Sequence, residues 1–418
     1  MFNVELGVPM CYENGVINWQ RVAHHRLVDV AVVLLALFAI GRIVTILPHA
    51  AQNNDFAHYY LSSRLLLNGE NPYRAQLEPL YQAHGFVSHP DVPTATNPPP
   101  LLWLFAPLAI LPANLAFVLW VGVEVSSLTV ILWLTCWLLG DRLGWRGWFL
   151  ICAGVVSASA VYWHFVYSQV QLTLAALILT GFYSRTRGAE TAACVVVAIA
   201  GLIKLFPLVL LPWFVWGGDE RGRWRRAVVT GLALVAGVLA TSPGLWVEFF
   251  RGAPAVLAAW AVNHTFNFTL PSFVANVGLA LSDALPARDW LLIGSVLGVG
   301  FIATCYAACR WGSLNDEAQF SLLSIAMLAG NVTAWGHYLV CLIFPVATTA
   351  VWVFRHGSAR RYVFLGLLYG GLNLVGTIEC TFFNDHYPLK ILANYIPLYA
   401  ILVWAVWLIS RKEADASR

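Results

Sequence analysis

The feature that most constrains this chain is a succession of long apolar segments. A helix needs about 20 mostly apolar residues to cross a membrane, and cutting the sequence at charges and Gly, Pro or Asn clusters leaves about twelve such segments. Composition agrees, because 59% of the 418 residues are hydrophobic and only 11% are charged. We predict an all-α polytopic membrane protein. The segments are approximately 27–48, 113–139, 146–166, 168–184, 189–204, 205–217, 227–242, 289–310, 318–335, 337–354, 361–378 and 392–410.

The charge distribution predicts how the chain is oriented. Cytoplasmic loops are enriched in Lys and Arg, and with both termini cytoplasmic all but seven of the 24 Lys and Arg residues fall on that side. Eight of the 11 histidines fall at or beyond the outer ends of helices. We therefore expect a plasma (inner) membrane protein with its chemistry on the extracytoplasmic face. The long outer loops are expected at 49–112, 243–288 and 379–391, within a single domain spanning 1–418.

The first outer loop contains the segment richest in reactive side chains, "NNDFAHYYLSSRLLLNGENPY" at 53–73. A short helix is predicted to begin at Asn54 or Asp55 and to stop at Asn68-Gly69. Helical spacing places four side chains on one face. This face is either part of a functional site, or an N-cap followed by an interfacial tyrosine belt. The four residues are Asp55, His58, Tyr59 and Ser62.

The later part of this loop is "NPPPLLWLFAPLAILP" at 97–112. It is too short and too rich in proline to span, so we expect it to lie at the membrane interface. The eight cysteines show no disulfide framework and no zinc spacing. No Asp-x-Asp pair, the usual holder of a divalent ion on a nucleotide sugar, occurs in the outer segments. No metal and no cofactor are expected.

An ordered set of motifs resembles glycosyltransferase family 87, part of the GT-C superfamily. Asp55 is followed by "GENPY" and by a Pro-Pro run before "APLAILP". Then come "YSQVQLTLAALIL", "GLIKLFPLVLLP", "VNHTFNFTLPS" and "TAWGHYLVCLIFP", so the resemblance covers residues 55 to 345. The chain departs from the family pattern at "TNPPP" (96–100), at Gln169-Val170-Gln171 and at Asn263-His264-Thr265.

The resemblance implies a multi-span enzyme that takes a sugar from a polyprenyl phosphate, with its site built on the first outer loop. Mannose or arabinofuranose would be the sugar, and a glycolipid or glycan hydroxyl the acceptor. An outward-facing site agrees with this donor, because nucleotide sugars are confined to the cytoplasm. The expected partners are therefore the lipid-linked donor, the acceptor and membrane lipids, with no nucleic acid.

Such a transfer needs a base for the acceptor hydroxyl and positive charge for the departing phosphate. Asp55 is the predicted base. Lys204, His337 and Arg64 are the predicted phosphate-binding residues. Lys204 would also suit a role as a snorkelling lysine, His337 a role as a hydrogen-bonded structural histidine, and Arg64 a role in binding lipid headgroups. The residues predicted to bind sugar or acceptor are His58, Tyr59, Gln169, Gln171, Asn263 and His264. Gln169, Gln171 and Asn263 could instead only pair with neighbouring helices.

Two other classes remain open. An O-antigen ligase or polymerase would share the outer site and the polyprenyl donor, but such enzymes rely on a large late outer loop. A lipid or sugar transporter would share the number of spans. However, the halves show no convincing internal repeat, and the expected functional charges gather at one face instead of mid-membrane.

Overall fold

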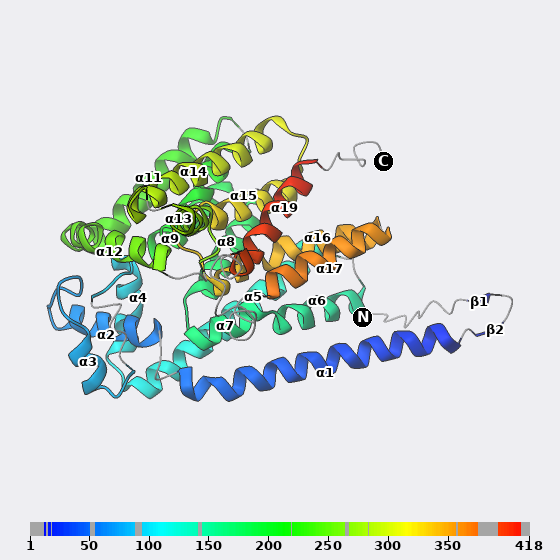
Figure 1. The fold of residues 1–418 in the computed structure, drawn as a ribbon, viewed down its shortest axis with the longest axis horizontal. Helices are drawn as coiled ribbons and strands as arrows, with labels where there is room; N and C mark the ends of the chain where they lie inside the picture. The colour runs from blue at the N-terminus through cyan, green and yellow to red at the C-terminus, as the bar shows by residue number, and fades with distance from the viewer. Residues whose placement is uncertain are drawn as a thin grey trace.

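The computed structural model describes residues 12–13, 16–17, 19–50, 55–87, 94–140, 144–218, 220–263, 267–282, 284–356, 358–374 and 392–410. The described part is almost entirely helical (Figure 1). Its elements are β1 (Tyr12–Glu13), β2 (Val16–Ile17), α1 (Trp19–Ala50), α2 (Asp55–Leu67), α3 (Glu78–Ala83), α4 (Pro99–Ala109), α5 (Ala113–Leu139), α6 (Trp145–Ser157), α7 (Ser159–Tyr167), α8 (Gln171–Thr186), α9 (Glu190–Ile203), η2 (Phe206–Leu210), α10 (Leu211–Trp216), α11 (Arg223–Ala240), α12 (Pro243–Asn263), α13 (Leu270–Leu281), α14 (Ala287–Trp311), α15 (Asp316–Ala329), η3 (Gly336–Leu342), α16 (Ile343–Arg355), α17 (Ala359–Asn373) and α19 (Ile396–Ser410).

Several described helices are suited to crossing a membrane. Four are long and apolar enough, namely Ala113–Leu139, Pro243–Val262, Ala287–Trp311 and Gly336–Arg355. A fifth span results if α6 and α7, which meet at a 45° bend, are counted together. These helices support a membrane protein, while the total of about twelve spans remains a prediction.

The segment between 243 and 288, which we expected to be an outer loop, is largely helical. It contains α12 and α13, and most of α12 is long and apolar enough to span. Charged residues near its start, Glu248 and Arg251, favour the loop interpretation from sequence. In the structure Arg251 donates to Glu248 one helical turn away, at 3.0 Å, so both charges are accommodated within the helix.

The predicted short helix after α1 is present as α2. It begins at Asp55 and ends at Leu67, and Gly69 follows with a φ of 77°, a left-handed conformation that glycine adopts easily. At the same end of the molecule lie α3, α4 and α12 (left in Figure 1). α2 packs against α4.

α4 is the proline-rich run that we expected at the interface. Pro98 and Pro99 begin it, because proline suits the first helical position, where no intrahelical N–H bond is lost. It is 11 residues long and is apolar but too short to count as a span. Trp103 and Leu104 stay exposed on its surface while Leu101 and Phe105 pack into the core. α4 therefore covers α2 on one side and leaves apolar side chains on the other.

Candidate active site

A cavity of about 590 Å³ lies between α2, the 94–98 segment, the α7–α8 junction, α12 and η3. Two of its walls differ in character. The polar lining consists of Asp55, His58, Tyr81, Thr96, Asn97, Tyr167, Gln169, Lys204, Asn331, Thr333, His337 and Tyr338. The apolar lining includes Phe249, Phe250, Pro254, Leu257, Ala258 and Trp260 of α12. The cavity therefore offers hydrogen-bonding groups on one side and a hydrocarbon surface on the other.

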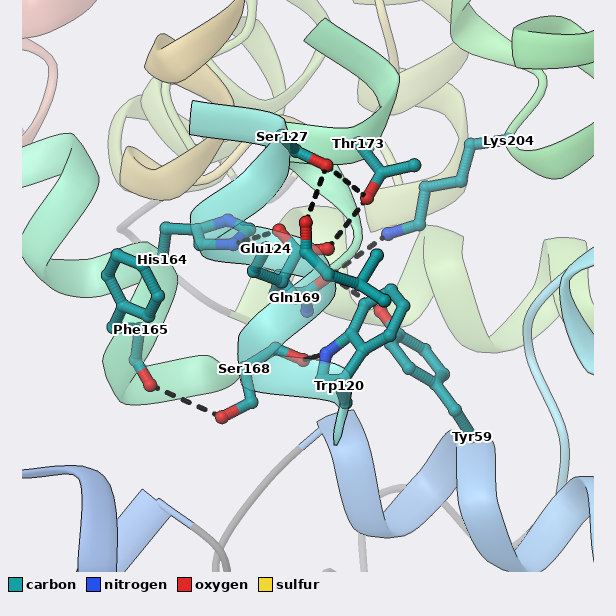
Figure 2. Close-up of polar contacts among 11 residues, drawn as sticks. Tyr59, Trp120, Glu124, Ser127, His164, Phe165, Ser168, Gln169, Thr173 and Lys204 are labelled. Atoms are coloured by element: carbon teal, nitrogen blue, oxygen red, sulfur yellow. Dashed lines mark hydrogen bonds and ion pairs between the residues drawn. The ribbon is translucent and has the colours of Figure 1, made fainter. Parts of the chain in front are cut away.

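The Gln169 side chain connects polar groups of this cavity, and Figure 2 shows its contacts with Tyr59 and Lys204. Its amide nitrogen donates to the Asp55 carboxylate. Its amide oxygen accepts from the Tyr59 hydroxyl at 2.6 Å and from the Lys204 ammonium at 3.2 Å. One neutral amide thus contacts both an acid of α2 and a cation at the end of α9.

Tyr59 supports this arrangement from within the core. Its ring is fully buried in α2. Burial, together with the neighbouring Asp55 carboxylate, raises the pKa of Tyr59 well above its usual value. The phenol therefore stays protonated and acts as the donor in its bond to Gln169.

Lys204 reaches the cavity from a break between two helices. It caps the end of α9 with an extended backbone, φ −142° and ψ 137°. Its ammonium contacts Gln169 and lies 3.3 Å from the Tyr338 hydroxyl. It also lies 5.2 Å from the centre of the Tyr338 ring, within cation–π range. The side chain is turned into the cavity lining.

His58 fastens the 94–98 segment to α2. The backbone N–H of Thr96 donates to His58 Nε2 at 3.3 Å, and the Tyr81 hydroxyl lies 3.5 Å from Nδ1. Because a backbone N–H can only donate, Nε2 is unprotonated, which makes this imidazole neutral with its proton on Nδ1. His58 is thus suited to hydrogen bonding and not to binding phosphate as a cation.

His337 lines the cavity at the first turn of η3. Its ring packs against Tyr167 and Tyr338, with centroids 5.3 and 5.0 Å apart. The residue is only 3% exposed, and among the described residues neither ring nitrogen has a hydrogen-bond partner. A buried imidazole is normally hydrogen-bonded, so this ring is available to a polar group of a substrate.

Two predicted residues lie away from the cavity. Arg64 donates to the Tyr60 hydroxyl at 3.0 Å and to Ala109 O, on the side of α2 that faces α4. It comes nine residues after Asp55, about two and a half helical turns, which places it on the opposite face. Gln171 is fully buried at the start of α8 and does not line the cavity. The geometry does not support a binding role for either side chain.

The remaining predictions fall at the end of α12. Asn263 is its last residue, and nothing is described of its side chain. His264 lies outside the described residues. Their roles remain predictions.

Several cavity residues were not predicted. Tyr81, Thr96 and Asn97 belong to the segment predicted as the first outer loop, and the last two lie in "TNPPP", one of the quoted motifs. Tyr167 comes two residues before Gln169 in the motif "YSQVQ", and Tyr338 directly follows His337 in "GHY". Their positions in those motifs could have identified them as candidate site residues.

The comparison with known families agrees with the motifs. The sequence model of the family described as Glycosyltransferase family 87 matches residues 95–333, more than half of the chain. Asp55 and His58 precede the matched segment, and His337 follows it. No curated protein matches the chain. The resemblance in the sequence is confirmed, and the chain belongs to glycosyltransferase family 87, a family of membrane glycosyltransferases.

Proposed function

We propose that this membrane glycosyltransferase moves a sugar, mannose or arabinofuranose, from a polyprenyl phosphate to a hydroxyl of a glycolipid or glycan. In this proposal the reaction takes place on the extracytoplasmic face and needs no metal. Asp55 acts as the general base, and Lys204 and His337 bind the donor phosphate.

The observation that carries the proposal is the position of Gln169 between Asp55 and Lys204. Its amide nitrogen bonds the carboxylate, and its oxygen lies 3.2 Å from the ammonium. The residues proposed as the base for the acceptor and as the cation for the leaving group thus belong to one cavity wall. Both are needed for glycosyl transfer from a phosphate.

The proposed reaction is a single displacement at the anomeric carbon. Asp55 takes the proton from the acceptor hydroxyl, and the acceptor oxygen forms a bond to that carbon. The bond from the carbon to the phosphate oxygen breaks, and its electron pair leaves with the polyprenyl phosphate. Lys204 stabilises the charge that grows on the phosphate, and a His337 N–H donates to a phosphate oxygen.

The apolar wall of the cavity supports a lipid-linked donor. α12 supplies Phe249, Phe250, Leu257 and Trp260 to this wall. Burying a hydrocarbon chain there is favourable by about 0.8 kcal/mol per CH₂ group. A free nucleotide sugar would gain nothing from this surface.

The orientation of the site rests on the Lys and Arg distribution. Asp55, His58 and Lys204 lie at the end of the molecule where few basic residues are found. Arg185, Arg187 and Arg226 belong to helix ends expected on the other side. This bias supports an extracytoplasmic active site.

The proposal is tested with the purified protein and a panel of polyprenyl-phosphate sugars, offered together with glycolipid and glycan acceptors. Release of polyprenyl phosphate with at least one donor, dependent on an acceptor, is the expected result. If no donor in the panel is consumed while nucleotide sugars are, the proposed donor class is wrong. Movement of a labelled lipid or sugar across vesicles without chemical change would favour a transporter.

A further inference from the structure

The short break between α7 and α8 carries Gln169 and has an unusual backbone. Ser168, which ends α7, has φ 48° and ψ 50°, in the left-handed region that residues other than glycine rarely adopt. Such a conformation persists only where surrounding contacts determine it. The Ser168 hydroxyl donates to Phe165 O at 3.3 Å, which is one such contact.

The other contacts come from one face of α5 (Figure 2). Trp120 Nε1 donates to Ser168 O at 3.2 Å. One turn further along, the Glu124 carboxylate contacts both helices at the break. Its Oε2 lies 2.5 Å from His164 Nε2 in α7, and its Oε1 accepts from the Thr173 hydroxyl in α8 at 2.8 Å. Glu124 therefore joins the last turn of α7 to the first turn of α8.

We infer that Glu124 and His164 are positioning residues for glycosyl transfer: their pair sets the α7–α8 break and so holds Gln169 in reach of Asp55 and Lys204. This inference rests on the proposed function of the cavity. Neither residue lines the cavity, so they act through Gln169 and not on the substrate.

The chemistry of the pair argues against a purely structural role. The side chains are 2% and 0% exposed, and Glu124 lies within the span Ala113–Leu139. Removing two ionisable groups from water is costly, and an apolar pair of similar volume would often be as stable or more stable. Ionisable groups inside a spanning helix are usually retained for function. An apolar pair could not supply a directional contact to two helices.

The inference predicts a particular kinetic signature. Loss of the pair lets the break relax, which moves the Gln169 amide away from Asp55. Misplacement by about 1 Å at a reacting group lowers rates about a hundredfold. The apolar wall and the phosphate contacts of His337 stay in place, so kcat falls while the KM for the donor changes little.

The test compares two doubly substituted proteins, in each of which an acid and its basic partner become apolar. Glu124→Leu/His164→Phe removes the pair at the break. Glu190→Leu/Arg226→Met is the matched control, because Arg226 is 1% exposed and bonds Glu190 between α9 and α11, remote from the cavity lining. We expect the first to lose kcat about a hundredfold per folded protein, and the control to keep it. Glu124→Gln, which keeps an acceptor for Thr173 and a polar group facing His164, should recover most of the activity.

Two further measurements separate the possible outcomes. In a cycle with Gln169→Leu, the losses of kcat should be far from additive, because both changes act on one amide. A cryo-EM structure of Glu124→Leu/His164→Phe should show the Gln169 amide beyond hydrogen-bonding distance of Asp55. An unmoved Gln169, additive losses, or an equal loss of kcat in the control would overturn the inference. The structural result decides the inference even if wild-type protein transfers no sugar, an outcome that would refute the proposed function instead.

Discussion

The Lys204 ammonium lies 3.2 Å from Oε1 of Gln169, and the amide nitrogen of the same Gln169 donates to Asp55. The three residues come from the end of α9, the α7–α8 break and the start of α2. Their mutual position fixes a cation and an acid on one wall of a cavity whose other wall is apolar. The predictions below follow from this arrangement.

Neutralising the cation should weaken the donor step. Lys204→Met keeps the length of the side chain but removes its charge, so donor affinity and turnover should both fall, with similar protein yield. Removing one stabilising group from a site of this kind lowers kcat by about a hundredfold to a thousandfold. Donor binding and single-turnover transfer are the measurements. Arg251→Met is the control, because Arg251 is an exposed cation on α12 that pairs with Glu248.

His337→Ala should impair the same step. If both side chains bind one phosphate, the effects of His337→Ala and Lys204→Met combined will be smaller than the sum of the separate free-energy losses. Fully additive losses, or normal donor binding by Lys204→Met, would detach these residues from the phosphate. Snorkelling would then be the better account of Lys204.

Gln171 gives a prediction about stability. Its amide is fully buried, and neither polar atom has a hydrogen-bond partner among the described residues. A buried polar group without a partner costs about 1–3 kcal/mol. Gln171→Leu should therefore leave the unfolding temperature unchanged or raise it, as measured by thermal denaturation in detergent. A marked fall in that temperature would reveal a partner for the amide, and a loss of turnover would restore the role predicted from sequence.

The composition and motifs were sufficient to predict the helical membrane fold, the short helix after α1 and the family. The helical period also placed Asp55 and His58 together correctly, since both line the cavity. The same period, followed for nine residues, would have turned Arg64 to the opposite face. Arg64 was predicted to bind phosphate because of its charge, without regard to its position around the helix axis.

The contacts between distant segments were beyond the sequence. Gln169 and Gln171 are alike in the motif "QVQ", yet the first lines the cavity and the second is buried in the core, next to the break at the left-handed Ser168. Glu124 and His164 are 40 residues apart, in helices whose hydropathy shows no sign of the pairing. Hydropathy is compatible with a spanning helix at Pro243–Val262, but it does not reveal that this helix supplies the apolar wall.

The orientation of the chain gives a labelling prediction. A cysteine in place of Glu78 should react with a membrane-impermeant thiol reagent in intact cells. One near Gly218, placed at Arg221, should be shielded until the membrane is broken. Gly218 itself is unsuitable, because its φ is 80° and a Cβ there would meet the Glu190 carboxylate. The reverse labelling pattern would put the cavity on the cytoplasmic side.

The most direct test of the proposed mechanism is single-turnover transfer by Asp55→Asn with a labelled polyprenyl-phosphate sugar. The amide has the shape of the carboxylate but does not take the acceptor proton, so donor binding should persist while the transfer rate falls about a hundredfold to ten-thousandfold. Glu78→Gln is the control, since Glu78 is an acid of the same segment between α1 and α5 that does not line the cavity. Transfer by Asp55→Asn at nearly the wild-type rate would contradict the mechanism and leave Asp55 as only the acidic first residue of α2.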